Sequence, residues 1–274
     1  MLRVPPRLVV GRELLDEPHV DPRALEASLA DLRVINRILG YTAGVVSDVW
    51  PLVREAAGRR GGEPVVVLDA GAGSGDIALA LARRAERERL PLTVLALDRH
   101  PGVLGVARRH LARVERGAAA RVRLVRGDAL SLPLGDGGVD VALASLFLHH
   151  LDDDAAVRLL CELARVARTG VVVSDIVRHP LALLGIRVLT RLGPFHPMTR
   201  HDGALSVRRA YTEAELRDLA ARAGLATHGR ALRHPLWRMA WVWRPAGDAP
   251  RHSPAARFVP EPAVPGDPRG TSRG

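Results

Sequence analysis

The segment Val65–Ala82 reads VVVLDAGAGSGDIALALA. Four apolar residues lead into Asp69, glycines follow at Gly71, Gly73 and Gly75, and small apolar residues continue the segment. A short apolar run bounded by glycine is typical of a buried parallel strand, and the residues that follow show a helical pattern. Strand, glycine turn and helix together predict a nucleotide-binding corner, because glycine lets backbone approach a ligand and a helix N-terminus presents unpaired N–H groups.

This corner lacks two common nucleotide-binding motifs. The dinucleotide fingerprint G-x-G-x-x-G requires a third glycine where this chain has Asp76. A phosphate-binding P-loop ends in Gly-Lys-Ser/Thr, and the sequence contains no lysine. What remains is Asp-x-Gly-x-Gly-x-Gly, from Asp69 to Gly75. On this motif alone, a glycine turn that binds no ligand stays open.

Strand and helix patterns alternate after the corner. Strands are expected at 65–69, 92–98, 121–126, 139–146 and 170–175, with helices ending near 87 and spanning about 101–116 and 154–167. This alternation predicts an α/β fold with a doubly wound, mostly parallel sheet. A capping box at Thr212 then begins a helix, and strands at 227–231 and 237–243 predict an antiparallel terminal hairpin that completes seven strands.

The remaining segments differ in composition. Residues 1–20 are rich in proline and charge and are expected to be loosely ordered, whereas 21–60 show helical periodicity. These helices predict an N-terminal cap over the nucleotide pocket, or elements that only cover a sheet edge. Residues 61–244 form the predicted α/β domain, with a loop rich in His, Pro and Arg after the apolar helix at 181–192. The Pro/Arg-rich residues 245–274 predict a disordered tail.

Charge and composition limit the partners. The net charge is +10, yet every basic residue is arginine, aromatic residues make up 3%, and the arginines are scattered. We therefore expect no nucleic-acid partner. The single Cys161 cannot form an intrachain disulfide, and no N-terminal signal pattern or apolar run of ~18 residues is present. These features predict a cytoplasmic protein with no stable membrane insertion.

The strand at 92–98 ends in a carboxylate, Asp98, which follows Gly73 by 25 residues. A carboxylate at this strand end can accept hydrogen bonds from both ribose hydroxyls of a nucleoside. Dinucleotide-binding folds use the same geometry, and an aspartate that only caps the next helix also stays open. The neighbouring Arg99 would lie beside the adenine ring.

A further motif follows the third strand, with Gly127-Asp128-Ala129 leading into Leu132-Pro133-Leu134 and Val139-Asp140. Together with the segment 69–75 and Asp98, this ordered set resembles the class I S-adenosylmethionine-dependent methyltransferases. The resemblance covers about residues 60–244 and implies a Rossmann-like methyltransferase fold with S-adenosylmethionine as cofactor. By the resemblance, Asp128 meets the adenine amino group, the Ala129 N–H meets a ring nitrogen, and the cofactor-binding set is Asp69, Gly71, Gly73, Gly75, Asp98, Arg99, Asp128, Ala129 and Ser145.

The fourth strand runs into Ser145-Leu146-Phe147-Leu148-His149-His150-Leu151-Asp152. This stretch resembles the L-H-H-L segment of ubiquinone/menaquinone-biosynthesis type methyltransferases. His149 or His150 can take a proton from a phenol or enol, or can only hydrogen-bond backbone; both roles stay open. Candidate acceptor contacts are Asp175, Arg178, Ser206 and Arg209, although a solvated basic loop is the more frequent case for a segment such as the one that holds the last two. No metal ligands are assigned, because methyl transfer from a sulfonium needs no metal.

These motifs predict an enzyme that methylates oxygen or carbon of a small, hydrophobic, phenol- or quinone-like acceptor. The apolar helix at 181–192 and the N-terminal helices are its candidate walls. A short-chain reductase would need a Tyr-x-x-x-Lys pair, and nucleic-acid amino-methyltransferases carry an Asn/Asp-Pro-Pro-Tyr-like tetrad where this chain has Ser145-Leu146-Phe147-Leu148. A non-catalytic binding or scaffold protein, and a methyltransferase acting on RNA or protein, remain as alternatives. The sequence predicts no oligomeric state.

Overall fold

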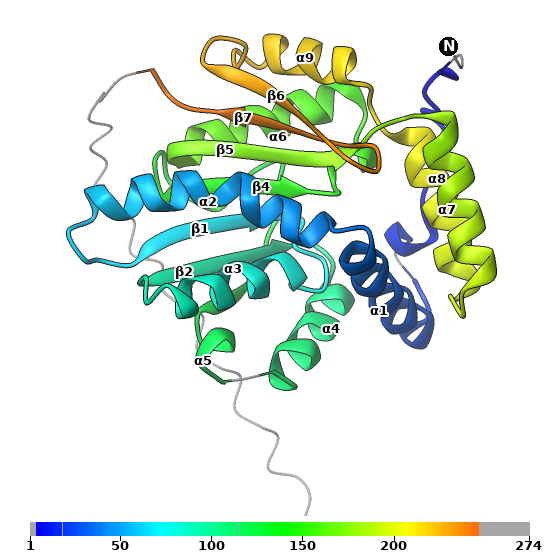
Figure 1. Ribbon diagram of the computed structural model, residues 1–274, viewed down its shortest axis with the longest axis horizontal. Helices are drawn as coiled ribbons and strands as arrows, with labels where there is room; N and C mark the ends of the chain where they lie inside the picture. The colour runs from blue at the N-terminus through cyan, green and yellow to red at the C-terminus, as the bar shows by residue number, and fades with distance from the viewer. Residues whose placement is uncertain (1–3, 18, 115, 247–274) are drawn as a thin grey trace, which may run out of the picture.

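One seven-stranded sheet organises the computed structural model, which describes residues 4–17, 19–114 and 116–246 (Figure 1). The strand order is β3-β2-β1-β4-β5-β7-β6, with the first five strands parallel and β7 antiparallel to both neighbours. This topology confirms the predicted α/β fold and its antiparallel hairpin. The strands are β1 (Val65–Ala70), β2 (Leu92–Asp98), β3 (Val122–Arg126), β4 (Val139–Ser145), β5 (Ala167–Ile176), β6 (Gly229–His234) and β7 (Arg238–Trp243).

Helices cover both faces of the sheet. On one face lie α2 (Tyr41–Arg59) and α3 (Asp76–Arg87), and on the other lie α6 (Asp153–Val166) and α9 (Glu213–Arg222) (Figure 1). The central strands are buried from both sides, which explains the nearly continuous apolar sequence of β1 and β4. Two separate apolar cores form, one on each face of the sheet.

A third group of helices stands at the carboxyl ends of the parallel strands. It contains α1 (Pro22–Ile38), α7 (Pro180–Leu192) and α8 (Pro197–Arg209), which Figure 1 shows together beyond one end of the sheet. Nearby lie α4 (Pro101–Ala112) and the short 3₁₀ turns η1 (Leu14–Asp16) and η2 (Leu148–His150), whereas α5 (Arg116–Ala119) precedes β3. Of the two N-terminal helices, α1 contacts α4 and α8 near the strand ends, whereas α2 packs on the face of the sheet over the central strands β1, β4 and β5 and not at an edge.

The structure corrects the loop expected after α7. Residues 197–209 form α8, with Pro197 at its first turn and the His196 ring accepting a hydrogen bond from the Met198 N–H at 3.2 Å. The sequence conceals this helix because its buried positions include the polar side chains Thr199, Asp202 and Arg209. A search for apolar residues at helical spacing therefore misses it.

The N-terminal segment also differs from the expected loose chain, because residues 4–17 make defined contacts. The Leu8 N–H donates to the Arg208 carbonyl at 3.0 Å, and Arg7 donates to the Leu151 carbonyl at 2.6 Å. The expected tail at 245–274 lies outside the described residues from 247 onward. Among the described helices, none combines the length and apolarity needed to cross a bilayer.

Candidate functional site

A large cavity opens where the parallel strands end, between the sheet and the helices α1, α7 and α8. Its volume is about 1190 Å³, above the range of about 300–1,000 Å³ typical of a pocket for one small ligand. Its lining joins the glycine turn after β1, the ends of β2 and β4, and residues of η1 and η2. The cavity is therefore large enough for two ligands side by side.

The glycine turn forms one end of the cavity. The N–H groups of Gly71 and Ala72 both donate to the Leu97 carbonyl at 2.9 Å, and the Gly73 N–H donates to Asp98 Oδ2 at 3.1 Å. The other Asp98 oxygen accepts from the His100 N–H at 2.9 Å. Burial raises the pKa of Asp98, and these two hydrogen bonds offset only part of that effect.

Three buried side-chain oxygens that line this end of the cavity have no hydrogen-bond partner among the described residues: Asp69 Oδ2, Asp76 Oδ2 and Ser145 Oγ. Burial, together with the charges of Asp76 and Asp98, raises the pKa of Asp69 to about 8. Buried polar atoms are nearly always paired, so these oxygens point to a ligand that donates hydrogen bonds and carries positive charge. The amino group and sulfonium of S-adenosylmethionine fit that requirement.

The residues predicted to hold the adenine also line the cavity. Ala129 is buried, and the exposed Asp128 accepts the Leu130 N–H through Oδ1 at 2.9 Å, which leaves Oδ2 available. Arg99 is exposed and also lines the cavity. Gly75 differs, because it stands at the N-terminus of α3 with a φ of 74° and is absent from the lining. The cofactor roles of these residues remain predictions.

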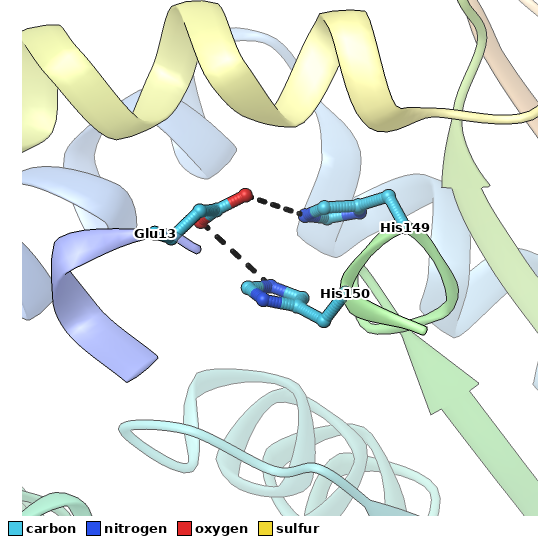
Figure 2. Close-up of side chains that lie close together, drawn as sticks. All are labelled: Glu13, His149 and His150. Carbon is cyan, nitrogen blue, oxygen red and sulfur yellow. Dashed lines mark ion pairs between the residues drawn. The ribbon is translucent and has the colours of Figure 1, made fainter. Parts of the chain in front are cut away.

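Two adjacent histidines on η2 form the polar centre of the cavity. His149 Nδ1 lies 2.8 Å from Asp175 Oδ1, and His150 Nδ1 lies 2.6 Å from Asp16 Oδ2. An ionised carboxylate only accepts hydrogen bonds, so each Nδ1 donates, and Nε2 of a neutral ring keeps its lone pair. Both Nε2 atoms face Glu13, whose carboxylate oxygens lie 3.6 Å from that of His149 and 3.9 Å from that of His150 (Figure 2).

The neighbouring carboxylates set the charge of His150. Burial lowers the pKa of His150, but the Glu13 charge and the hydrogen bond to Asp16 outweigh it and raise the pKa to about 9. For Asp16, burial raises the pKa, while the hydrogen bond with His150 and its charge bring about a net lowering. Without another cation, this cluster therefore holds a proton on His150 at neutral pH.

Two of the four candidate acceptor contacts line the cavity, and the other two do not. Ser206 and Arg209 line the cavity; Ser206 donates to Glu13 Oε1 at 2.7 Å, and Arg209 donates to the His149 carbonyl at 3.0 Å. Asp175 and Arg178 do not line it. Asp175 is buried beneath His149, where its Oδ2 also accepts the His149 backbone N–H.

Arg178 was predicted to contact the acceptor, but it lies outside the cavity lining and forms hydrogen bonds within the fold. Its guanidinium donates to Glu215 Oε1 at 2.7 Å, to the Ala210 carbonyl at 2.6 Å and to the Pro5 carbonyl at 2.8 Å. These bonds join the start of α9 to the N-terminal segment.

The sequence analysis missed Glu13 and Asp16. Both lie in a segment expected to be loosely ordered, and Asp16 is 134 residues from His150. No motif or periodic pattern marks either residue. Glu13 is 5% exposed, an unusual burial for a glutamate, and only the fold reveals it.

Apolar side chains from α1 and the residue after it, and from α7 and α8, form the wall opposite the glycine turn. They are Leu29, Leu32, Ile35, Leu39, Ala182, Ile186, Leu189 and Val207. The cavity thus has a polar, acidic end at the glycine turn, an apolar end, and the histidines between them.

Comparison with known proteins identifies relatives of this chain. Residues 67–170 match a family model described as a methyltransferase domain. An uncharacterized methyltransferase of Mycobacterium sp. (strain JLS) is 33% identical over 196 residues, which is 70% of this chain and 62% of that protein. Demethylmenaquinone methyltransferase of Thermus thermophilus is 31% identical over 229 residues, which is 79% of this chain and 96% of that protein.

The fold of human N-acetylserotonin methyltransferase, solved in complex with S-adenosylmethionine, is similar, with a TM-score of 0.57 and 17% identity over 82% of this chain and 56% of that one. Three mycobacterial relatives are longer proteins, and the matched region spans 54–62% of their length.

Proposed function

Because this chain belongs to the class I S-adenosylmethionine-dependent methyltransferases, and within them to the ubiquinone/menaquinone-biosynthesis type, we propose that it methylates oxygen or carbon of a small, hydrophobic, phenol- or quinone-like acceptor. S-adenosylmethionine is its cofactor and supplies a methyl group bound to a positively charged sulfur. The observation that supports the proposal is one cavity with an acidic end at the glycine turn and an apolar end walled by α1, α7 and α8.

The donor end accounts for binding and orientation. Asp69 and Asp76 offer unpaired oxygens to the amino group, and Asp98, held by the Gly73 and His100 N–H groups, offers its carboxylate to the ribose. A held donor makes the reaction with a neighbouring acceptor effectively intramolecular, which in well-oriented systems is worth about 7–11 kcal/mol of the barrier. Orientation is therefore the main contribution of these residues.

The acceptor end must also remove a proton. An acceptor oxygen or carbon that takes the methyl group, whose bonding electrons would stay on the donor sulfur, would have to release one proton. The acceptor's proton passes to a base, and His149 Nε2 faces the cavity with its Nδ1 proton held by Asp175 at 2.8 Å. Asp175 is thus a positioning residue in this proposal, and His149 is the group that touches the acceptor.

An apolar groove beside the cavity supports a lipophilic acceptor. Its volume is about 900 Å³, and it shares Gly185, Leu189 and Trp237 with the cavity. Its walls include the side chains of Leu184, Val188 and Leu192, which are 46–84% exposed. A ring held near the histidines could extend a hydrocarbon tail along this groove. The Thermus relative named for demethylmenaquinone is consistent with such an acceptor.

The test is a methyl-transfer assay with a 1,4-naphthohydroquinone carrying a short hydrocarbon tail, and with the corresponding naphthol. We expect mass spectrometry to detect a product one CH₂ heavier, together with stoichiometric S-adenosylhomocysteine. Methylation of RNA or protein but of neither lipophilic acceptor would overturn the assignment. Tight donor binding with no turnover on any acceptor would instead support a non-catalytic binding protein.

A further inference from the structure

We propose that Glu13, His149 and His150 form a binding site for a divalent transition-metal ion at the boundary between the two ends of the cavity. The sequence analysis assigned no metal ligands, and Glu13 reaches the histidines only through the fold. Figure 2 shows the three side chains pointing toward one another, from the N-terminal segment and from η2.

The distances suit one ion. All three ligand atoms lie within 4.8 Å of one another. Glu13 Oε1 lies 3.6 Å from His149 Nε2, and Glu13 Oε2 lies 3.9 Å from His150 Nε2. Two ligand atoms that each lie about 2.1 Å from one tetrahedral ion are about 3.4 Å apart. The three ligand atoms would therefore have to move together by no more than about 1.4 Å to complete the coordination.

Each ligand is already oriented by a further partner. Asp175 accepts from His149 Nδ1 at 2.8 Å, Asp16 accepts from His150 Nδ1 at 2.6 Å, and Ser206 donates to Glu13 at 2.7 Å. Carboxylates that bind the far nitrogen of metal-ligating histidines fix the ring orientation and raise the basicity of the ligand. Here two such pairs direct their free Nε2 atoms toward the same carboxylate, Glu13. Two histidines with only structural roles would not need this arrangement.

The local charge also favours a cation. Glu13 and Asp175 are 5% and 2% exposed, and Asp16 is half-buried. Arg209 is close by, but its guanidinium donates to the backbone carbonyls of Gly11, His149 and His150. Even with a proton on His150, the three carboxylates outnumber the two cations, His150 and Arg209, and a divalent ion that displaces this proton would neutralise the remaining negative charge.

The ligand set selects the class of metal. Two imidazoles and one carboxylate are typical of zinc and of non-haem iron sites, whereas magnesium and calcium prefer oxygen ligands. Three protein ligands leave at least one coordination position open, and all three residues line the cavity. If the proposed function holds, that position would take the acceptor's hydroxyl oxygen and lower its pKa, in place of proton removal by His149 Nε2.

The experiment uses tag-free, full-length protein treated with a chelator and then titrated with Co²⁺, followed by Zn²⁺ as competitor. We expect visible absorption bands of protein-bound Co²⁺, a stoichiometry of one by calorimetry, and displacement by Zn²⁺. Glu13→Gln removes the anionic ligand with little change of shape, and Glu17→Gln, at an exposed position of the same segment, is its matched control.

Asp16→Asn tests the site without removing a ligand. Loss of such an orienting partner weakens metal affinity by about 10–100-fold, and loss of a ligand weakens it more. We therefore expect the Zn²⁺ affinity to fall in the order wild type and Glu17→Gln, then Asp16→Asn, then Glu13→Gln. If Glu13→Gln fails to fold, the lower Zn²⁺ affinity of Asp16→Asn relative to wild type and Glu17→Gln still tests the site.

Titration with S-adenosylhomocysteine separates this proposal from the proposed function. No Co²⁺ spectrum in wild type, or equal Zn²⁺ affinity in wild type and both site variants, would overturn the metal site. If the protein shows no metal site but still binds S-adenosylhomocysteine and methylates its acceptor, the proposed function holds without the metal site. Metal binding without affinity for S-adenosylhomocysteine would instead overturn the proposed function and keep the metal site.

Discussion

The backbone N–H of Gly73 donates to the carboxylate of Asp98 at 3.1 Å, which ties the glycine turn after β1 to the end of β2. The second oxygen of that carboxylate accepts the His100 N–H at 2.9 Å, just before α4. The sequence left two roles open for Asp98, a ribose contact and a local cap. The structure contains the local cap, the bond from the His100 N–H, and it also places Asp98 in the lining of the cavity.

Asp98→Ala should therefore weaken cofactor binding and also reduce stability. Each hydrogen bond to a charged group contributes about 1.5–3 kcal/mol, so a loss of at least about 2 kcal/mol in unfolding free energy is expected when both are removed. We expect S-adenosylhomocysteine affinity to fall at least tenfold by calorimetry, a loss of about 1.4 kcal/mol. Asp154→Ala, which removes an exposed ion pair with Arg222, is the control and should change neither quantity appreciably. Unchanged affinity in Asp98→Ala would place the ribose elsewhere.

The residues predicted for the donor side line one cavity, apart from Gly75, and the sequence signals that mark them are local. The glycine turn, the strand that ends in Asp98 and the segment Gly127-Asp128-Ala129 each encode their geometry within a few residues. The structure brings these segments to one cavity because parallel strands end at the same edge of the sheet. Chain order and strand periodicity were thus enough to predict that these segments meet.

The acceptor side could not be predicted in the same way. Glu13 and Asp16 reach the histidines through tertiary contacts with α8, where Asp202 accepts the Leu14 and Leu15 N–H groups at 2.9 and 3.1 Å. Those contacts depend on a helix whose buried face is partly polar. Arg178 illustrates the converse, because its position after a strand suggested a substrate contact and the fold pairs it with Glu215.

Two glycines of the turn should respond differently to alanine. Gly73 has a φ of 55° and open space where a β-carbon would lie, whereas a β-carbon on Gly71 would lie 2.7 Å from the Phe147 ring. The left-handed conformation alone costs alanine about 1–2 kcal/mol. We expect Gly73→Ala to fold with about that loss in urea denaturation and to lose cofactor affinity, because its methyl group enters the cavity.

Gly71→Ala should lose more stability than Gly73→Ala, since the clash with Phe147 adds to the backbone strain. Equal stability of the two variants, measured in the same urea series, would contradict this account of the turn.

The stability of the cofactor-free protein should fall with rising pH because of Asp69. Burial raises the pKa of Asp69 to about 8 from 3.8, so between these values the folded state binds more protons than the unfolded state, and unfolding free energy falls as pH rises. Asp69→Asn removes this titration. We expect the melting temperature of wild type to decline more steeply than that of Asp69→Asn between about pH 5 and pH 8.5.

Asp218→Asn, at an exposed position on α9, is the matched control and should follow the wild-type pH profile. Parallel profiles for wild type and Asp69→Asn would mean that Asp69 is ionised throughout this range.

The apolar groove on α7 should matter only for acceptors with a hydrocarbon tail. Leu184 and Val188 are 58% and 46% exposed, so replacing both with serine removes apolar surface without opening the core, and stability should change by no more than about 0.5 kcal/mol per site. Burial of apolar surface contributes about 25 cal/mol per Å², so a tail that loses about 60 Å² of contact loses about 1.5 kcal/mol of binding. We therefore expect the double variant to raise KM roughly tenfold for a tailed naphthohydroquinone, by that same free energy. For the tail-less ring, KM and the affinity for S-adenosylhomocysteine should stay at their wild-type values.

An equal rise in KM for both acceptors would show that the substitutions act on the cavity itself. An unchanged KM for both acceptors would show that the groove is not part of the acceptor site.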